Sequence, residues 1–116
     1  MFKFINKILS KNENSAAFKR SMAEKLSGKS IKYVTQRIDG ADSVIGHEGA
    51  IIIKNDELLI YSSLNVVFRV KIDQMRASEL FSLEGVIITG PDLTENGSER
   101  TVIAYYTYYL KPGRGL

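Results

Sequence analysis

The sequence predicts a mainly β domain of the α+β class: a small antiparallel, strongly bent β-sheet or barrel of about six strands, with an N-terminal helix. Three observations predict this fold. Apolar residues recur about every four positions before Ser30 and about every two positions after it, as in a change from helix to strand. Between residues 50 and 72, three β-rich runs follow one another, separated by turn residues. Gly46 and Gly49 lie where a strand would bulge or bend sharply.

The composition of the 116-residue chain is that of one domain, long enough to fold without covalent staples. The chain contains no cysteine, which excludes disulfides, thiol nucleophiles and thiolate metal sites and fits a reducing compartment. No apolar run approaches the roughly 20 residues that a membrane span requires. We therefore expect a cytoplasmic protein.

The positive charge of the chain is concentrated near its N-terminus. Residues 1–29 carry seven Lys and Arg against two acidic residues, a balance of +5, whereas residues 30–116 carry nine against eleven, a balance of −2. A nucleic-acid-binding barrel usually carries its positive charge on the barrel itself. Nucleic acid is therefore the weaker candidate partner.

Residues 1–14 are expected to form a basic amphipathic or flexible leader. If residues 1–11 are helical, one broad side is apolar and the three lysines recur at i, i+4 and i+8 on another. Such a helix can lie on an anionic membrane surface or in the groove of a partner. The alternative is a leader that packs on its own domain or is disordered. The residues that would contact a membrane are Phe2, Lys3, Ile5, Lys7, Ile8, Leu9 and Lys11.

A second helix is predicted at 15–27, at the start of a single domain that extends to residue 110. Phe18, Met22 and Leu26 recur every four residues, and Ser15, or the residue before it, offers a side-chain oxygen for the N-cap. A charged helix with one apolar stripe requires a surface to cover. We expect it to pack against an open end or an edge of the sheet.

The strands are predicted from alternation, β-branched content and the turn residues between them. Asp73 is expected to cap a short helical turn at 74–80, in which Met75 and Leu80 face inward. Residues 94–100 read as an exposed loop, and residues 111–116 as a flexible tail. The expected strands are 31–38, 43–53, 58–61, 66–72, 83–89 and 101–110.

The last predicted strand holds four tyrosines within five positions, and alternation leaves both of its faces apolar. It is either covered on both sides or presents an aromatic binding face. Tyr106 and Tyr108 are therefore candidates for contact with a partner; the alternative is that they pack under the helix at 15–27. Arg69 and Lys71 share the solvated face of their strand and are candidates for contact with an anionic group.

Motifs for catalysis or cofactor binding are not found in the sequence. His47 is the one histidine, and Glu48 beside it would point to the opposite face of a strand. The carboxylates show no recurring metal-ligand spacing, and no glycine-rich segment leads from a strand into a helix to hold a phosphate. We expect no cofactor and no metal, and we favour a protein that is not an enzyme.

The strand pattern from residue 31 to 110 resembles small bacterial barrels of the pleckstrin-homology-like type. The segments that carry the resemblance are EGAIII at 48–53, ELLIY at 57–61 and LEGVII at 83–88. The resemblance implies a barrel that binds proteins or lipid head groups and is not an enzyme. An alternative resemblance is to the Sm-like RNA-binding barrels, through LNVV at 64–67 and IITG at 87–90. That family would imply a ring-sized oligomer and salt-sensitive RNA binding.

Together these observations predict a non-catalytic binding or scaffold module. Its partner is an unknown protein, a second copy of the chain, or an anionic membrane surface bound weakly. The first alternative is the Sm-like RNA-binding oligomer. The second is an enzyme of unrecognised type, which would require an exposed His47 with a carboxylate nearby.

Overall fold

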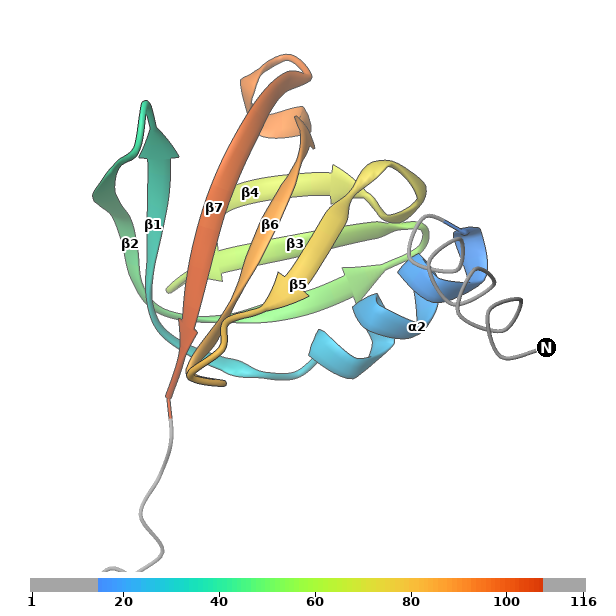
Figure 1. Cartoon of the computed structure of the whole chain (residues 1–116), viewed down its shortest axis with the longest axis horizontal. Helices are drawn as coiled ribbons and strands as arrows, with labels where there is room; N and C mark the ends of the chain where they lie inside the picture. Colours follow the sequence, from blue (N-terminus) through green and yellow to red (C-terminus); the bar gives the residue numbers. More distant parts are fainter. Residues whose placement is uncertain (1–14, 108–116) are drawn as a thin grey trace, which may run out of the picture.

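The computed structural model describes residues 15–107, which form a seven-stranded antiparallel sheet and an N-terminal helix (Figure 1). The leader and the tail lie outside the described residues. The strand order is β4-β3-β2-β1-β7-β6-β5. The strands are β1 Ser30–Ile38, β2 Ala41–Lys54, β3 Glu57–Ser62, β4 Asn65–Lys71, β5 Arg76–Glu79, β6 Gly85–Asp92 and β7 Ser98–Tyr106.

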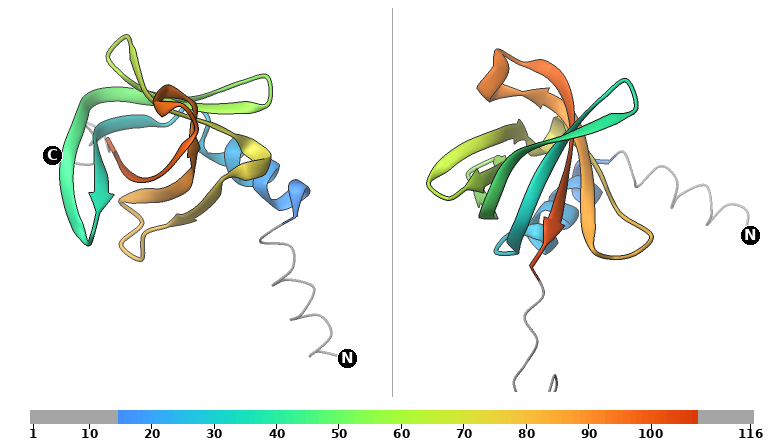
Figure 2. Two further views of the ribbon diagram at one scale, coloured as in Figure 1. Left: turned by 90° about the horizontal axis from the view of Figure 1, so that it is seen from above. Right: turned by 90° about the vertical axis from the view of Figure 1, so that its left-hand side faces the viewer.

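Two meanders, β1 to β4 and β5 to β7, are joined by antiparallel pairing of β1 with β7. The sheet coils strongly, as the two views in Figure 2 show, but β4 and β5 remain its two edges and are not paired with each other. The sheet is therefore not closed into a barrel, which corrects that part of the prediction. The helix α2, Ala16–Leu26, packs against β2, β5 and the 3-10 turn between β4 and β5, where the two edges diverge.

The long strand β2 bends where the sequence predicts it. Its register against β1 shifts between the pairs Val34 with Gly46 and Thr35 with Val44, so Ile45 forms a bulge next to a glycine. Gly49 lies against β3 so closely that an added Cβ would sit 1.6 Å from the carbonyl oxygen of Tyr61. Only glycine fits this approach of two backbones.

The helix α2 begins and packs as predicted. The Ser15 hydroxyl accepts a hydrogen bond from the Phe18 N–H at 3.1 Å and caps the first turn. Ala23 and Leu26 are fully buried in the core, whereas Phe18 and Met22 are half-buried. The apolar stripe of the helix therefore divides: its last turn joins the core, and its first two turns line the surface beside β5.

Residues 74–80 do not form the predicted helical turn. A 3-10 turn spans Ile72–Gln74, and the chain then enters β5, which pairs with β6. The sheet therefore has seven strands, whereas the sequence predicts about six. The Arg-Ala-Ser-Glu sequence of β5 has little intrinsic strand preference, so its conformation depends on hydrogen bonding to β6. Met75 is buried as predicted, and Leu80 is half-buried.

The core lies on the concave side of the sheet. In β4, Phe68 and Val70 are fully buried and Lys71 is exposed, which confirms the alternation predicted for this strand. The remaining buried apolar side chains come from α2 and from the other long strands. No helix in residues 15–107 is long and apolar enough to cross a membrane.

Candidate binding surface

Tyr106 is a core residue and not an exposed contact, which corrects its assignment as a partner-binding residue. Its side chain is 4% exposed because β7 is a central strand whose concave face is covered. Its hydroxyl donates to Glu79 Oε2 at 3.4 Å, and the ammonium of Lys29 lies 4.9 Å from the ring centroid. The alternative prediction for Tyr106, that its side chain packs inside the domain, therefore holds. Tyr108 lies outside the described residues.

Arg69 and Lys71 lie on β4, and each faces an acidic residue. Arg69 Nε is 2.9 Å from Glu57 Oε1, and Lys71 Nζ is 3.8 Å from Asp56 Oδ2. An anionic ligand would have to compete with these carboxylates, so the pair is a poor anchor for one. Their role in binding stays a prediction.

The predicted membrane-contacting residues of the leader all lie outside the described residues. The structure therefore places none of Phe2, Lys3, Ile5, Lys7, Ile8, Leu9 and Lys11. It does place the point at which the leader joins the domain, at Ser15 and the first turn of α2.

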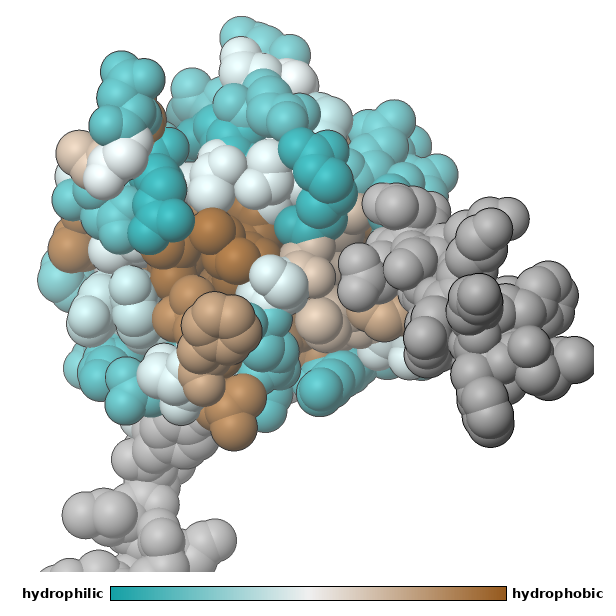
Figure 3. Space-filling view, viewed as in Figure 1, coloured by the Kyte–Doolittle hydropathy of each residue, from teal (hydrophilic) through white to brown (hydrophobic). Residues whose placement is uncertain are grey.

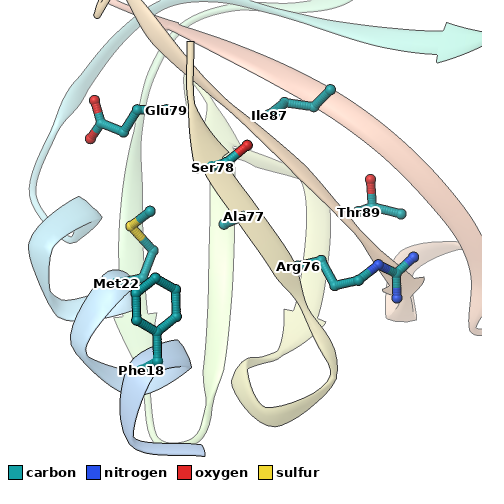
Figure 4. Close-up of a pocket in the computed structure, with 8 residues that line it drawn as sticks. All are labelled: Phe18, Met22, Arg76, Ala77, Ser78, Glu79, Ile87 and Thr89. Atoms are coloured by element: carbon teal, nitrogen blue, oxygen red, sulfur yellow. The ribbon is translucent and has the colours of Figure 1, made fainter. Parts of the chain in front are cut away.

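A groove of about 410 Å³ runs between α2 and the β5–β6 hairpin (Figure 4). Two apolar side chains one helical turn apart, Phe18 and Met22, point from α2 toward β5. The opposite side is formed by the four residues of β5 and by Ile87 and Thr89 of β6. We name this feature the α2–β5 groove.

Charged residues mark the two ends of the α2–β5 groove. At one end Arg76 Nη2 is 2.6 Å from Glu99 Oε2, and at the other Glu79 Oε2 is 3.8 Å from Lys25 Nζ. Glu79 keeps 21% of its side chain exposed. The groove thus has apolar side chains from both of its sides, Phe18, Met22, Ala77 and Ile87, together with an arginine near the Phe18 end and a carboxylate near the C-terminal end of α2 (Figure 4).

One edge of β5 has no strand partner within residues 15–107. β5 pairs with β6 on one side, and its other side faces α2 across the groove (Figure 4). An edge strand presents a row of backbone N–H and C=O groups that proteins commonly cover with a helix or a loop. The α2–β5 groove therefore combines a partly apolar lining with a strand edge that has no strand partner among the described residues.

The apolar character extends beyond the groove across the convex face of the sheet. Figure 3 shows an apolar area over β7, β6 and β5 that continues toward α2. On this face Tyr33 and Tyr105 lie with their ring centroids 4.7 Å apart, and burial, with a further contribution from Tyr33, raises the pKa of the Tyr105 phenol. At the β5–β6 turn, Phe81 is fully exposed and Leu83 is 62% exposed. Such a continuous apolar area commonly marks an interaction surface.

His47 has an exposed side chain in β2. Its backbone N–H donates to Ser62 Oγ at 2.9 Å, and the Ser62 hydroxyl donates back to the His47 carbonyl oxygen at 2.9 Å. These bonds fix the backbone of His47 and do not orient its imidazole. Within residues 15–107, no group of three or more His, Cys, Asp or Glu side chains is placed to hold a metal ion.

The sequence points to two of the groove residues and not to the others. It predicts Phe18 and Met22 as an apolar stripe, but it predicts a helical turn for the segment opposite them. A signal was present in β6, where Ile87 and Thr89 alternate with buried Val86 and Ile88, so that both faces carry apolar side chains. That pattern indicates a second covered face.

A scan of protein-family models finds no match to this chain, and searches of curated proteins and solved structures find no significant match.

Proposed function

We propose that this chain is a non-catalytic binding module that takes up an amphipathic helical segment of a protein partner in the α2–β5 groove. The observation that carries the proposal is the combination of a partly apolar groove of about 410 Å³ with a strand edge that has no strand partner within residues 15–107. Helix-in-groove binding uses apolar anchors at i, i+3 or i+4 and i+7. Phe18, Met22 and Ile87 supply the apolar side chains that such anchors would contact.

The charged ends of the groove favour one orientation of the partner helix. Glu79 would attract a basic residue at one end, whereas Arg76 would attract an acidic residue at the other. Both side chains already have partners of opposite charge on the domain, so their effect is on orientation more than on affinity. The preferred ligand is thus an amphipathic helix with opposite charges at its two ends.

Our proposal includes the resemblance of this chain to small barrels of the pleckstrin-homology-like type. It is supported by the strongly coiled, seven-stranded antiparallel sheet and by a helix beside the gap between its edges. The resemblance implies protein or lipid head-group binding and no catalysis, and a cytoplasmic location fits the cysteine-free sequence. The Sm-like and enzymatic alternatives stay predictions.

The test is selection from a phage-displayed library of amphipathic helical peptides of about 11 residues, the length of α2. Selected peptides should shift the backbone amide signals of Ala77, Ser78 and Ile87 in NMR spectra of the full chain. The variant Ile87→Glu should lose binding by at least about tenfold, because it places a charge in the apolar lining.

The matched control for this test is Ser43→Glu, which adds the same charge on the exposed part of β2 away from the groove. It should bind selected peptides as the natural chain does. The proposal is overturned if no peptide is selected, or if the selected peptides bind Ile87→Glu and the natural chain equally.

A further inference from the structure

We propose that the leader of this chain, as a second helix antiparallel to α2, occupies the α2–β5 groove and competes with the partner segment. This inference rests on the proposed function, because it names what regulates access to the same groove. Two independent features carry it: the length and attachment of the leader, and its apolar face.

The length and attachment of the leader fit an antiparallel helical hairpin. The leader joins the domain at Ser15, and Phe18, three residues later, already lines the groove. Residues 1–11 have the amphipathic pattern, and the polar residues 12–14 leave a connection of the length common between antiparallel helices. A helix of 11 residues is about 16 Å long. Because α2 also has 11 residues, a returning helix would run beside it from end to end.

The apolar face of the leader matches the lining of the groove. In an antiparallel hairpin, Leu9 would lie at the level of Phe18 and Ile5 at the level of Met22. This pairing would bury the half-buried side chains of α2 further, and the leader would lie beside the edge of β5 that has no strand partner within residues 15–107. The lysines would remain on the solvent side.

The short connection at 12–14 requires the antiparallel direction, and the charges near the end of α2 are compatible with it. This direction brings Lys3 to the end of the groove where Glu79 lies near Lys25. Glu79 is the one acidic residue among the groove-lining side chains, and part of its carboxylate side chain remains exposed. Lys11 would lie toward the other end, where Arg76 is paired with Glu99, so the charges alone do not set the direction.

The test uses paramagnetic relaxation in the full-length chain. The natural sequence has no cysteine, so Asn6→Cys gives one nitroxide label on the polar side of the leader. The amide signals of Ala77, Ser78 and Ile87 should broaden most, and that of Asp42 in the β1–β2 hairpin should stay sharp. Leu9→Glu should abolish the broadening, whereas Ser10→Glu, with the same charge on the polar side, should keep it.

Two results would overturn the inference. The first is that the groove amides remain sharp in the labelled chain. The second comes from a mixture of two chains, one that carries only the isotope label and one that carries only the nitroxide. If the groove amides of the isotope-labelled chain broaden in this mixture, the groove is occupied by the leader of a second copy.

A peptide selected against the groove separates this inference from the proposed function. If the leader fills the groove nine-tenths of the time, Leu9→Glu should bind that peptide about tenfold more tightly than the natural chain, and Ser10→Glu should not. Equal affinities without broadening would overturn the inference alone. Broadening of the groove amides with no peptide selected would overturn the proposed function alone.

Discussion

At the β1–β2 hairpin, Arg37 holds Asp42 in a two-point contact. Nε lies 2.8 Å from Oδ1 and Nη2 lies 3.1 Å from Oδ2, the geometry in which guanidinium groups bind carboxylates best. These hydrogen bonds, and secondarily the positive charge, lower the pKa of the Asp42 carboxyl below its usual value. The same contact raises the pKa of Arg37.

The first prediction concerns the titration of Asp42. In Arg37→Gln, the pKa of Asp42 should rise toward the value of about 3.9 seen in unfolded chains. Because the folded-state pKa is depressed, the contribution of this carboxylate to stability is present above the unfolded value and is lost as the pH falls through the folded value. NMR titration of the side-chain carboxyl measures the shift directly. Arg20→Gln on α2 is the control, and an unchanged Asp42 titration in Arg37→Gln would contradict the prediction.

Gly49 offers a second test at the residue scale. In Gly49→Ala the new Cβ would fall 1.6 Å from the Tyr61 carbonyl oxygen, so β2 and β3 would have to separate. We expect the free energy of unfolding in urea to drop by about 3 kcal/mol, the upper part of the range for overpacking. In the control Gly97→Ala, nothing lies within 4 Å of the new Cβ, and only the cost of its left-handed φ of +81° remains, about 1 kcal/mol. Equal losses in the two variants would show that the close approach is not limiting.

At the scale of elements, a buried ion pair attaches the edge strand β4 to β6 and β7. Asp92, fully buried at the end of β6, accepts hydrogen bonds from the Arg69 N–H of β4 at 3.1 Å and from the Thr94 N–H at 2.9 Å. It also contacts the guanidinium of Arg100 from β7, which reaches Gln36 of β1 and the Val67 carbonyl oxygen of β4. These contacts hold the coiled sheet together where strand pairing stops.

Removal of the buried charge should therefore destabilise the whole sheet. Asp92→Asn leaves the guanidinium of Arg100, 15% exposed, without its anionic partner, and we expect a loss of about 3–5 kcal/mol in the free energy of unfolding. Urea unfolding followed by circular dichroism measures it. Asp56→Asn, the same change at a side chain that is 71% exposed, should lose less than about 1 kcal/mol. A loss for Asp92→Asn as small as that of the control would mean that the pair is not required.

The elements that the sequence predicts correctly are those with a strong local period. The helix α2 and the strands β1, β3 and β4 lie within a few residues of their predicted bounds because capping residues, alternation and turn residues determine them locally. β6 begins two residues later than expected, since Leu83 adopts a left-handed φ of +64° in the turn before it.

What the sequence does not predict depends on contacts between distant elements. β5 becomes a strand through its pairing with β6, and without β5 the opposite side of the groove cannot be anticipated. Tyr106 is buried because β7 lies in the centre of the sheet, a position that alternation alone does not give. The open sheet likewise depends on where α2 and the buried ion pair lie, and neither follows from a local pattern.

At the scale of the whole molecule, residues 1–11 of the leader carry three lysines and no acidic residue, whereas residues 15–116 are nearly balanced, with thirteen Lys and Arg against twelve Asp and Glu. We propose two competing destinations for the leader: the α2–β5 groove and an anionic membrane surface. A single amphipathic helix has one apolar face, which cannot contact both at once. Membrane binding by the leader therefore requires that it first leave the groove, and the occupancy of the groove sets the apparent membrane affinity.

This competition predicts the outcome of flotation with vesicles that contain anionic lipid at low salt. The natural chain should float weakly, and Ile87→Glu should float more strongly, because a charge in the groove expels the leader and frees its apolar face. Salt should release the bound chain, since the lysines of the leader provide the electrostatic attraction. The double variant Ile87→Glu with Leu9→Glu should not float.

Ser43→Glu, which carries the same added charge away from the groove, should behave as the natural chain does. If the natural chain floats as strongly as Ile87→Glu, the leader is free of the groove; if only the natural chain floats, the groove itself contacts the membrane.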